Sequence, residues 1–431
     1  MVKRGTRDKN EAPSQPLQRW KHQRWGTLED PVHKSHMSTL LGEYSCTRQF
    51  HFDRERELHG EDERETCSGK TEVGTAAHET IARALRNDEL RESILAGAPR
   101  ASIEQVRRVL EVEFQRATAG RTVRWYGKAE ADDTLADAAA MVHGLFSDLH
   151  RHVAAVELVE AGFIAQLGPY WIEGHTDLIY RPRENPEALA FTDWKTGAQK
   201  PHQLALDHGY ESGFYSVALE RGLFLPVALV EQWRELARAD RSAEVPLDAW
   251  DMTALRHTDD DRRAMHLCLR AVARRQSQGL GLAEGARQFH RFPEVIRLTH
   301  LADYVPYEKK GAKKVERPED VAHWSRVFGR EVTPGEKITY ERGQTRGGAW
   351  LHVRRTPGDV QRLERLLRAV VGWVRMGKFV ESVGEKCTRC PYKAACLTSG
   401  YELAGDEAKA LNASLRGLDH SGTDELSLDD D

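Results

Sequence analysis

The stretch 170–197 reads YWIEGHTDLIYRPRENPEALAFTDWKTG, and it decides the fold. It contains two short runs rich in β-branched and aromatic residues, 170–180 and 188–194, on either side of a polar segment with Pro and Asn. Such runs predict two neighbouring strands. Residues 156–167 have the same character and are followed directly by Gly-Pro, so they predict another strand before these two. Together the runs predict a meander of three strands.

Acidic and basic residues lie near the ends of the last two strands. Asp193 and Lys195 are two residues apart, so they project from the same face of their strand. If that strand pairs with the one before it, Asp177 lies beside them. Two carboxylates so placed can bind Mg²⁺ or Mn²⁺, which stabilises charge on a scissile phosphate, while the lysine holds the attacking water or the phosphate. By itself, an Asp-x-Lys pattern is also found on ordinary exposed strands.

Apolar residues at helical spacing predict helices around this sheet. We expect helices at 38–50, 71–86, 103–116, 132–150, about 202–221 and 359–376, and further strands at 295–305 and 349–355. His78 lies on the second helix and could add a nitrogen ligand if that helix packs over the sheet edge. The alternative is an ordinary hydrogen-bonded histidine. Residues 222–294 fit the order least well and predict a mostly helical insertion that widens the fold.

Length and composition indicate a globular protein. The 431 residues, 40% apolar and 30% charged, suffice for two or three domain-sized units or for one core with insertions. We expect no membrane span, no signal peptide and a cytoplasmic location. The net charge of −4 hides eight Lys/Arg against four Asp/Glu in 1–36, and nine Asp/Glu against two Lys/Arg in 401–431. We therefore expect a mobile basic tail, a body over 37–400 and a disordered acidic tail, with nucleic acid bound in a local basic groove.

Four of the six cysteines lie near the two ends of the chain. Cys387, Cys390 and Cys396 form a Cys-x-x-Cys-x5-Cys cluster, and Cys46 stands alone near the N-terminus. This clustering favours a metal centre in a reducing compartment over disulfides. One soft-metal centre could tie both ends of the chain together. A zinc ion and an iron–sulfur cluster would use the same number of thiolates.

Several of these segments resemble the PD-(D/E)XK nuclease superfamily, in the branch that holds the RecB and AddB nuclease domains and the CRISPR-associated adaptation nucleases. The matching segments are GTAAH around His78, EGHTD around Asp177, FTDWKTG around Asp193 and Lys195, and the following helix with Tyr215. The resemblance covers three parts of the chain, roughly residues 38–86, 150–220 and 345–396.

The resemblance implies an α/β fold of the restriction-endonuclease type, in which helices flank a mixed central sheet. It implies that Lys195 is catalytic and that the metal ligands are His78, Asp177, Asp193 and the carbonyl of Trp194. It also implies a [4Fe–4S] cluster, with zinc as the alternative, that joins the N- and C-terminal parts through Cys46, Cys387, Cys390 and Cys396.

One position departs from the family pattern. The helix after the acid/lysine strand usually carries Gln-x-x-x-Tyr, whereas here Glu211 stands four residues before Tyr215. The two share a helix face, but a glutamate repels a phosphate where a glutamine donates a hydrogen bond to it. We expect both side chains to lie at the substrate.

The expected activity is Mg²⁺- or Mn²⁺-dependent cleavage of DNA, as an exonuclease on single-stranded or frayed ends, in repair, recombination or defence. No Gly-x4-Gly-Lys-Ser/Thr phosphate loop is present, so a helicase or another protein would act in trans. Basic runs at 309–317 and 342–355 could follow a phosphate backbone. The alternative is a non-catalytic DNA-binding or assembly subunit with an iron–sulfur or zinc centre, against which the complete set Asp177, Asp193 and Lys195 argues.

Overall fold

The computed structural model describes residues 24–41, 50, 66–125, 131–197, 206, 210–258, 260–304, 309–315, 318, 321, 325, 331–342, 349–353 and 355–376. The predicted metal-binding cysteines lie outside these ranges, as does the predicted acidic tail over 401–431. Residues 24–36, which the charge pattern assigned to a mobile tail, are part of the folded body. Trp25 is fully buried in the core there, so the body begins before residue 37.

The predicted meander forms the centre of the sheet. It consists of β4 (Val153–Leu167), β5 (Tyr170–Pro182) and β6 (Ala190–Lys195). Each strand pairs antiparallel with the next. The tight turn between β4 and β5 contains Gly168, whose φ of 59° is in the left-handed region that glycine tolerates.

Four more strands complete a seven-stranded mixed sheet with the order β11-β8-β6-β5-β4-β7, to which β1 is added through β5. β8 (Val295–His300) pairs parallel with β6, and β1 (Val32–His33) pairs parallel with β5. β7 (Leu223–Pro226) and β11 (Ala349–His352) pair antiparallel at the two edges. The predicted mixed central sheet is confirmed. β8 is shorter than the predicted strand 295–305, because a 3-10 turn begins at Leu301.

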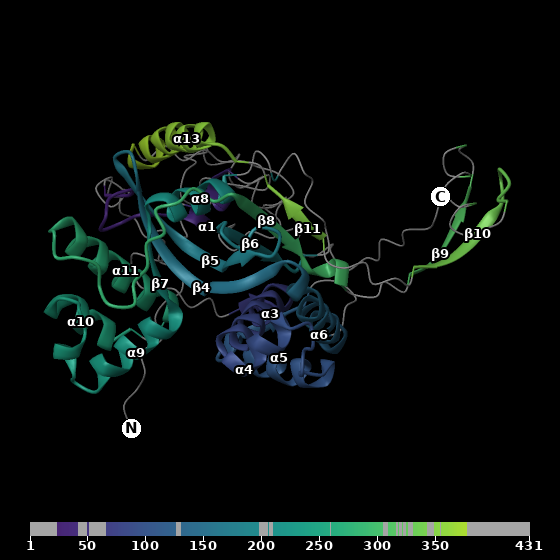
Figure 1. Cartoon of the computed structure of the whole chain (residues 1–431), viewed down its shortest axis with the longest axis horizontal. Coiled ribbons are helices and arrows are strands. Elements are labelled where there is room, and N and C mark those ends of the chain that lie inside the picture. The colour runs from purple at the N-terminus through teal and green to yellow at the C-terminus, as the bar shows by residue number, and fades with distance from the viewer. Residues whose placement is uncertain are drawn as a thin grey trace, which may run out of the picture.

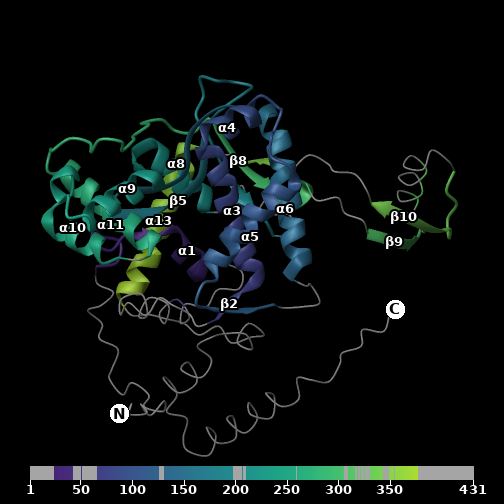
Figure 2. The same ribbon diagram turned by 90° about the horizontal axis from the view of Figure 1, so that it is seen from below.

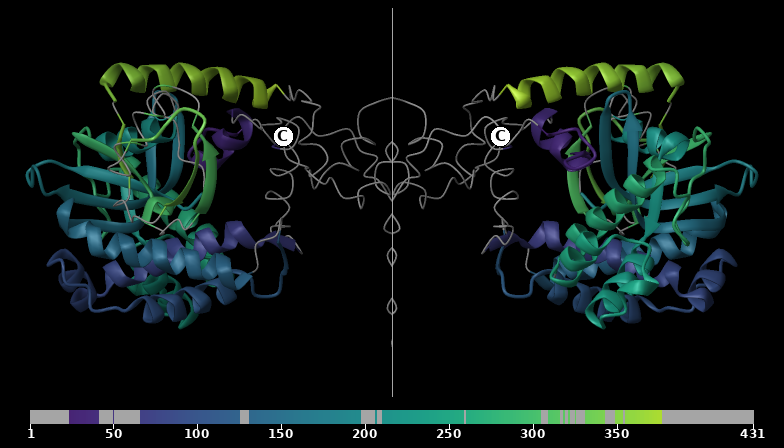
Figure 3. Two further views of the ribbon diagram at one scale, coloured as in Figure 1. Left: turned by 90° about the vertical axis from the view of Figure 1, so that its right-hand side faces the viewer. Right: turned by 90° about the vertical axis from the view of Figure 1, so that its left-hand side faces the viewer.

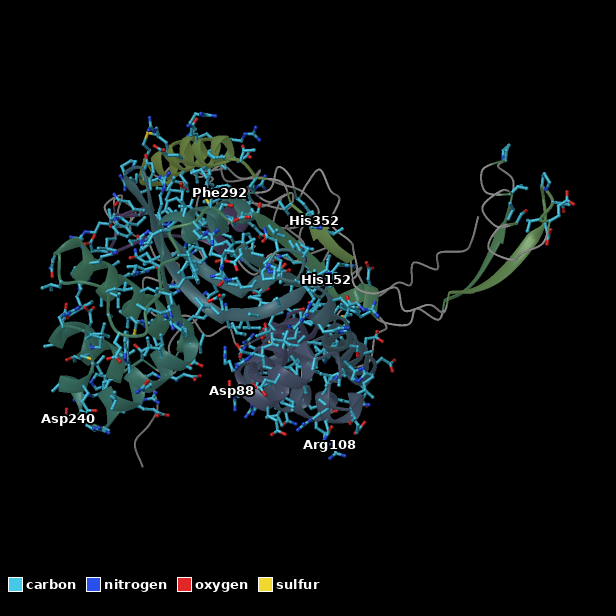
Figure 4. The ribbon with its side chains drawn as sticks, in the orientation of Figure 1. Asp88, Arg108, His152, Asp240, Phe292 and His352 are labelled. Atoms are coloured by element: carbon cyan, nitrogen blue, oxygen red, sulfur yellow. The ribbon has the colours of Figure 1, made fainter. Side chains whose placement is uncertain are left out.

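Helices cover both faces of this sheet (Figure 1), so the sheet lies in the middle of the molecule (Figure 3). One face is covered by α3 (Gly69–Arg86), α4 (Asp88–Leu95), α5 (Ile103–Ala117) and α6 (Ala131–Asp148). The other face is covered by α1 (Lys34–Leu41), α8 (Glu211–Arg221) and α13 (Pro357–Arg375). In the α3–α6 group, Arg108 on α5 lies at the outer surface (Figure 4). The fold is therefore a sheet between two helical layers.

Local sequence explains where α13 begins and which side it buries. Thr356 is its N-cap, Pro357 is the first helical residue, and Asp359 completes a capping box with the Thr356 backbone N–H and hydroxyl. The predicted start at Asp359 is thus late, because this aspartate is the third helical residue rather than the cap. The predicted apolar face is buried as a unit, through Val360, Leu363, Leu367, Val370, Val371 and Val374.

The segment 222–294 is mostly helical, as predicted, but it also supplies a strand to the central sheet. After β7 come α9 (Val227–Arg238), α10 (Ala249–Arg256) and α11 (Asp261–Ser277). Their apolar sides and one side of β7 form a core of their own, with Trp233, Leu255 and Leu269 buried in it. The group lies at the β7 edge of the sheet, opposite the β11 edge (Figure 1), and in the view from below it lies to one side of α3, α4, α5 and α6 (Figure 2).

A two-stranded hairpin of β9 (Lys309–Lys314) and β10 (Lys337–Arg342) lies away from the main body (Figure 1). Its first strand reads KKGAKK and contains much of the basic run noted above. A second small sheet pairs β2 (Thr66–Ser68) with β3 (Thr122–Arg124). No helix among the described residues has the length and apolar character needed to cross a bilayer.

Candidate active site

Three side chains that can bind a metal meet where β4, β5 and α3 come together. The antiparallel register of β4 and β5 places Glu160 opposite Asp177. Nδ1 of His78, on α3, lies 3.5 Å from Asp177 Oδ1 and 3.7 Å from Glu160 Oε1. One donor atom from each side chain lies within 4.8 Å of the other two. Carboxylate oxygens with one imidazole nitrogen are a donor set that suits Mg²⁺ or Mn²⁺.

Glu160 is held there at an energetic cost. Its φ of 45° lies in the left-handed region, which costs a residue other than glycine roughly 1–2 kcal/mol. Its Oε1 atom is buried and has no hydrogen-bond partner among the described residues. Burial, opposed by His78 and aided by Asp177, raises the pKa of Glu160 to about 7. Strain and an unsatisfied buried carboxylate together indicate a site built for a ligand.

The position of His78 depends on a close helix–strand approach. At Gly74 a Cβ atom would lie 2.9 Å from Thr196 Oγ1, just beyond the end of β6. The missing side chain lets α3 approach that strand end, and His78 follows one turn later on the same helix. Burial disfavours charge on His78, but Asp177 and Glu160 outweigh it and raise the pKa of its imidazole well above the ordinary value. In the GTAAH segment, the glycine thus allows close packing of α3 on the end of β6, and the histidine interacts electrostatically with the two carboxylates.

Asp193 lies next to this group and is surrounded by donors. Its Oδ2 is 2.7 Å from Lys195 Nζ, and its Oδ1 is 3.5 Å from Lys34 Nζ. The buried Tyr215 donates its hydroxyl to Asp193 Oδ1 at 2.8 Å, and Lys34 donates to the oxygen of that hydroxyl. The backbone N–H of Trp194 donates to Asp177 Oδ2 at 2.5 Å and so connects Asp193 to the metal-binding group.

The charges of Asp193 and the residues around it stabilise one another. Burial disfavours ionisation of Asp193, but Lys195 and Lys34 outweigh it and hold the pKa of the carboxyl below its usual range. Burial likewise disfavours a charged Lys195, but Asp193 and Glu211 raise the pKa of the ammonium group. Burial and Asp193 raise the pKa of Tyr215 well above its ordinary value. At neutral pH the site therefore holds an ionised Asp193, a charged Lys195 and a neutral Tyr215.

Glu211 contacts the same lysine. It is the first residue of α8, and its Oε2 lies 3.4 Å from Lys195 Nζ. Both side chains are about one third exposed, 35% for Glu211 and 36% for Lys195. Glu211 therefore lies at the open side of the site, one turn before Tyr215, rather than among the ligands His78, Glu160 and Asp177.

A cavity of about 220 Å³ adjoins Asp193. One wall comes from the start of α8 and another from β8, and most of the lining side chains are apolar. The lining residues are Phe191, Asp193, Leu206, Tyr210, Glu211, Ser212, Tyr215, Ile296, Arg297, Leu298 and Val353.

The structure brings the predicted residues of the sheet together and adds two more. His78 and Asp177 are neighbours, as expected from the resemblance, but the third group beside them is Glu160. Asp193 is paired with the two lysines instead. Sequence reasoning missed Glu160 because its strand carries a second glutamate, Glu157, and no motif that singles out either one. It missed Lys34 because the residue lies in the presumed tail. Glu160 could have been found only from the register of the two predicted strands, because β4 runs antiparallel to β5 and brings this acid opposite Asp177.

Comparison with known proteins agrees with this geometry. No curated protein matches the chain by sequence. The family model described as PD-(D/E)XK nuclease superfamily matches residues 37–397, which include every residue of the site except Lys34. By this match the chain belongs to the PD-(D/E)XK nuclease superfamily.

Proposed function

We propose that this protein is a metal-dependent DNA nuclease that degrades single-stranded or frayed ends as an exonuclease, in repair, recombination or defence. The observation that carries the proposal is a partly buried set of two carboxylates and an imidazole, from α3, β4 and β5, close to a lysine-paired aspartate near the end of β6. Membership of a nuclease superfamily supports the reaction class. The strand β9, with the sequence KKGAKK, carries positive charge of the kind that a phosphate backbone attracts.

The residues present fit a hard divalent cation. Glu160 Oε1 is buried without a hydrogen-bond partner in the described part of the chain, and a cation would satisfy it. His78, Glu160 and Asp177 would hold Mg²⁺ or Mn²⁺, with Asp193 and the Trp194 carbonyl as the further ligands that the family resemblance implies. When bound, the ion supplies Lewis-acid stabilisation of negative charge at the scissile phosphate.

The other side chains act by position and charge. Lys195 holds its ammonium group at the open side of Asp193, where it can orient a water or contact a phosphate oxygen. Lys34 and Tyr215 fix the Asp193 carboxylate from its other oxygen. Glu211 limits the positive charge that Lys195 presents to a substrate.

The proposed activity is tested on the full-length chain, purified anaerobically and incubated with end-labelled single- and double-stranded DNA plus Mn²⁺. Shortening of single strands from their ends, absent in EDTA, is the expected result. Cleavage of closed circular DNA would instead indicate an endonuclease. Binding without cleavage under every metal tested would favour a non-catalytic DNA-binding or assembly subunit that works with a helicase in trans.

A [4Fe–4S] cluster on Cys46, Cys387, Cys390 and Cys396 is the second part of the proposal. It rests on the spacing of these cysteines and on the family resemblance. We expect the anaerobic protein to be brown, with about four iron atoms per chain. The substitution Cys390→Ala should remove iron and solubility together, because the cluster would join distant parts of the chain. Cys67→Ala, at a buried free thiol on β2, is the matched control and should keep the iron. A colourless protein with stoichiometric zinc would contradict the cluster.

Glu211→Gln tests the charge at the open side of the site. The change keeps the shape of the side chain but removes a carboxylate that lies 3.4 Å from Lys195 Nζ. Because Lys195 then presents its full charge to a phosphate, single-stranded DNA should bind roughly two- to fivefold more tightly at low salt. Fluorescence anisotropy measures this. Glu220→Gln, on the same helix beside Arg221, is the control and should leave affinity unchanged. Weaker binding or a higher Mn²⁺ requirement in Glu211→Gln would place the residue at the metal instead.

A further inference from the structure

A second group of potential metal ligands lies outside the site described above. His33 of β1, His175 of β5 and His266 of α11 each offer a ring nitrogen within 4.8 Å of the other two. The ring centroids of His33 and His266 are 5.1 Å apart, those of His175 and His266 5.5 Å, and those of His33 and His175 6.2 Å. All three rings are steeply inclined to one another, at 61–87°. They therefore meet edge to face rather than as a stack.

This cluster is not explained by packing. Nε2 of His33 is buried and makes no hydrogen bond within the described part of the chain. Three half-buried imidazoles with an unsatisfied nitrogen cost free energy unless a ligand occupies the space between them. Imidazole nitrogens are common ligands of d-block metal cations.

The ion pair of Glu173 and Arg270 lies beside the ring of His266. Glu173 lies 3.3 Å from His266 Nδ1 and is held by two nitrogens of Arg270, at 2.8 and 3.3 Å. His266 Nδ1 makes no hydrogen bond within the described part of the chain, but the negative charge of Glu173 beside it favours the tautomer that carries its proton there, which leaves the lone pair on Nε2 for a metal. Carboxylate support of this kind is a recurrent feature of histidine–zinc sites.

We propose that His33, His175 and His266 form a binding site for a divalent d-block cation, for which Zn²⁺ is the chemically best match. Three imidazoles leave one position of a tetrahedral zinc ion for water. Nitrogen ligands prefer zinc to Mg²⁺ or Ca²⁺. Zinc–nitrogen bonds of about 2.0–2.1 Å place ligand nitrogens about 3.4 Å apart, so small side-chain rotations bring the three rings onto the ion.

Binding also requires a change at His33. The Ser35 amide donates to its Nδ1 at 3.1 Å, which favours a proton on Nε2. The Ser35 hydroxyl oxygen, 2.6 Å from the same Nδ1, can accept a hydrogen bond from a protonated Nδ1 once the ion takes the Nε2 lone pair. Metal binding at Nε2 therefore moves the ring proton to Nδ1.

The site would join three parts of the fold. β1 contributes only two residues to the sheet, and α11 belongs to the helical group beside β7. An ion held by all three histidines would fix β1 and α11 to β5. Lys34, which contacts Asp193, follows His33 directly in the chain. The proposed role is structural, so it does not depend on the nuclease activity.

Zinc stoichiometry of the full-length chain tests the site. Protein stripped with a chelator is reloaded with ZnSO₄, desalted and measured by elemental analysis, and its melting temperature is recorded with and without zinc. We expect His266→Ala to bind one zinc ion fewer than the unsubstituted protein and to lose the rise in melting temperature. The difference of one ion holds even if the cysteines or the nuclease site also take zinc.

His257→Ala, an exposed histidine at the end of α10, is the matched control and should keep the full zinc content. His33→Gln is a second variant at the opposite side of the cluster, in case His266→Ala does not fold. Cobalt loading adds an independent readout, because tetrahedral Co²⁺ gives visible d–d bands, and both variants should show these bands at lower intensity than the unsubstituted protein. Equal zinc content in the unsubstituted protein and in a folded His266→Ala or His33→Gln variant would overturn the proposal.

Discussion

Lys195→Ala should reduce DNA cleavage at least on the order of a hundredfold while the protein still folds. The ammonium group lies 2.7 Å from Asp193 Oδ2, on a side chain that is more exposed than that of Lys34, the other lysine beside this carboxylate. The side chain is 36% exposed, so its removal leaves no large buried cavity. The rate should fall through loss of transition-state stabilisation, which single-turnover cleavage of end-labelled DNA at saturating Mn²⁺ measures.

A matched control separates this effect from a change in overall charge. Lys70→Ala removes an exposed lysine at the start of α3 and should cleave normally. Both variants should melt within a few degrees of the unsubstituted protein. Unchanged turnover in Lys195→Ala would remove this lysine from the mechanism and with it the assignment of the site.

Glu160→Gln should raise the Mn²⁺ concentration needed for half-maximal cleavage by about tenfold or more. The substitution removes one negative charge from the set with His78 and Asp177 and leaves the shape unchanged. Mutation of residues that only hydrogen-bond to a metal ligand lowers metal affinity by about 10–100-fold. Loss of a carboxylate that binds the metal directly should lower it by at least as much. Titration of activity with Mn²⁺, and calorimetric Mn²⁺ binding to the metal-free protein, give two separate measures.

Stability distinguishes a metal ligand from a structural residue at this position. In the metal-free protein the Glu160 carboxyl has a pKa of about 7, raised above its unfolded value. The folded state therefore binds more protons than the unfolded state between about pH 4.5 and 7, and stability falls as pH rises through this window. In the Glu160→Gln protein, stability should therefore decrease less between these pH values. In EDTA at pH 7 its melting temperature should be no lower than that of the unsubstituted protein.

Glu157→Gln serves as the control for that experiment. Glu157 lies on the same strand and pairs with Arg181 at 2.6 Å, away from the metal-binding set. It should alter neither the Mn²⁺ requirement nor the pH dependence. A strongly destabilised Glu160→Gln protein with an unchanged Mn²⁺ requirement would mean that Glu160 supports the fold and not the ion.

Local sequence was sufficient for the elements whose chemistry is local. The meander over 156–194 could be predicted because strand runs and turn residues alternate there, and β4, β5 and β6 follow that pattern. The buried face of α13 could be predicted because its six apolar residues recur at helical spacing. The Asp-x-Lys pair could be placed because residues two apart share a strand face. These inferences needed only periodicity and neighbouring residues.

The composition of the site depended on tertiary contacts. Glu160 joins Asp177 only through the register of β4 on β5, and its left-handed backbone conformation has no signature in the surrounding residues. Lys34 reaches Asp193 only because β1 adds to the sheet beside β5 and brings the start of α1 to the site.

The three-histidine cluster also depends on tertiary contacts, between residues that lie even farther apart in the chain. His33, His175 and His266 lie far apart in the chain, and no spacing rule connects them. The sequence by itself determined the three central strands, several of the helices around them and the reactive pair on β6. Packing decided which charges meet, because the free energy of an ion pair or a metal site depends on distances between side chains that many residues separate.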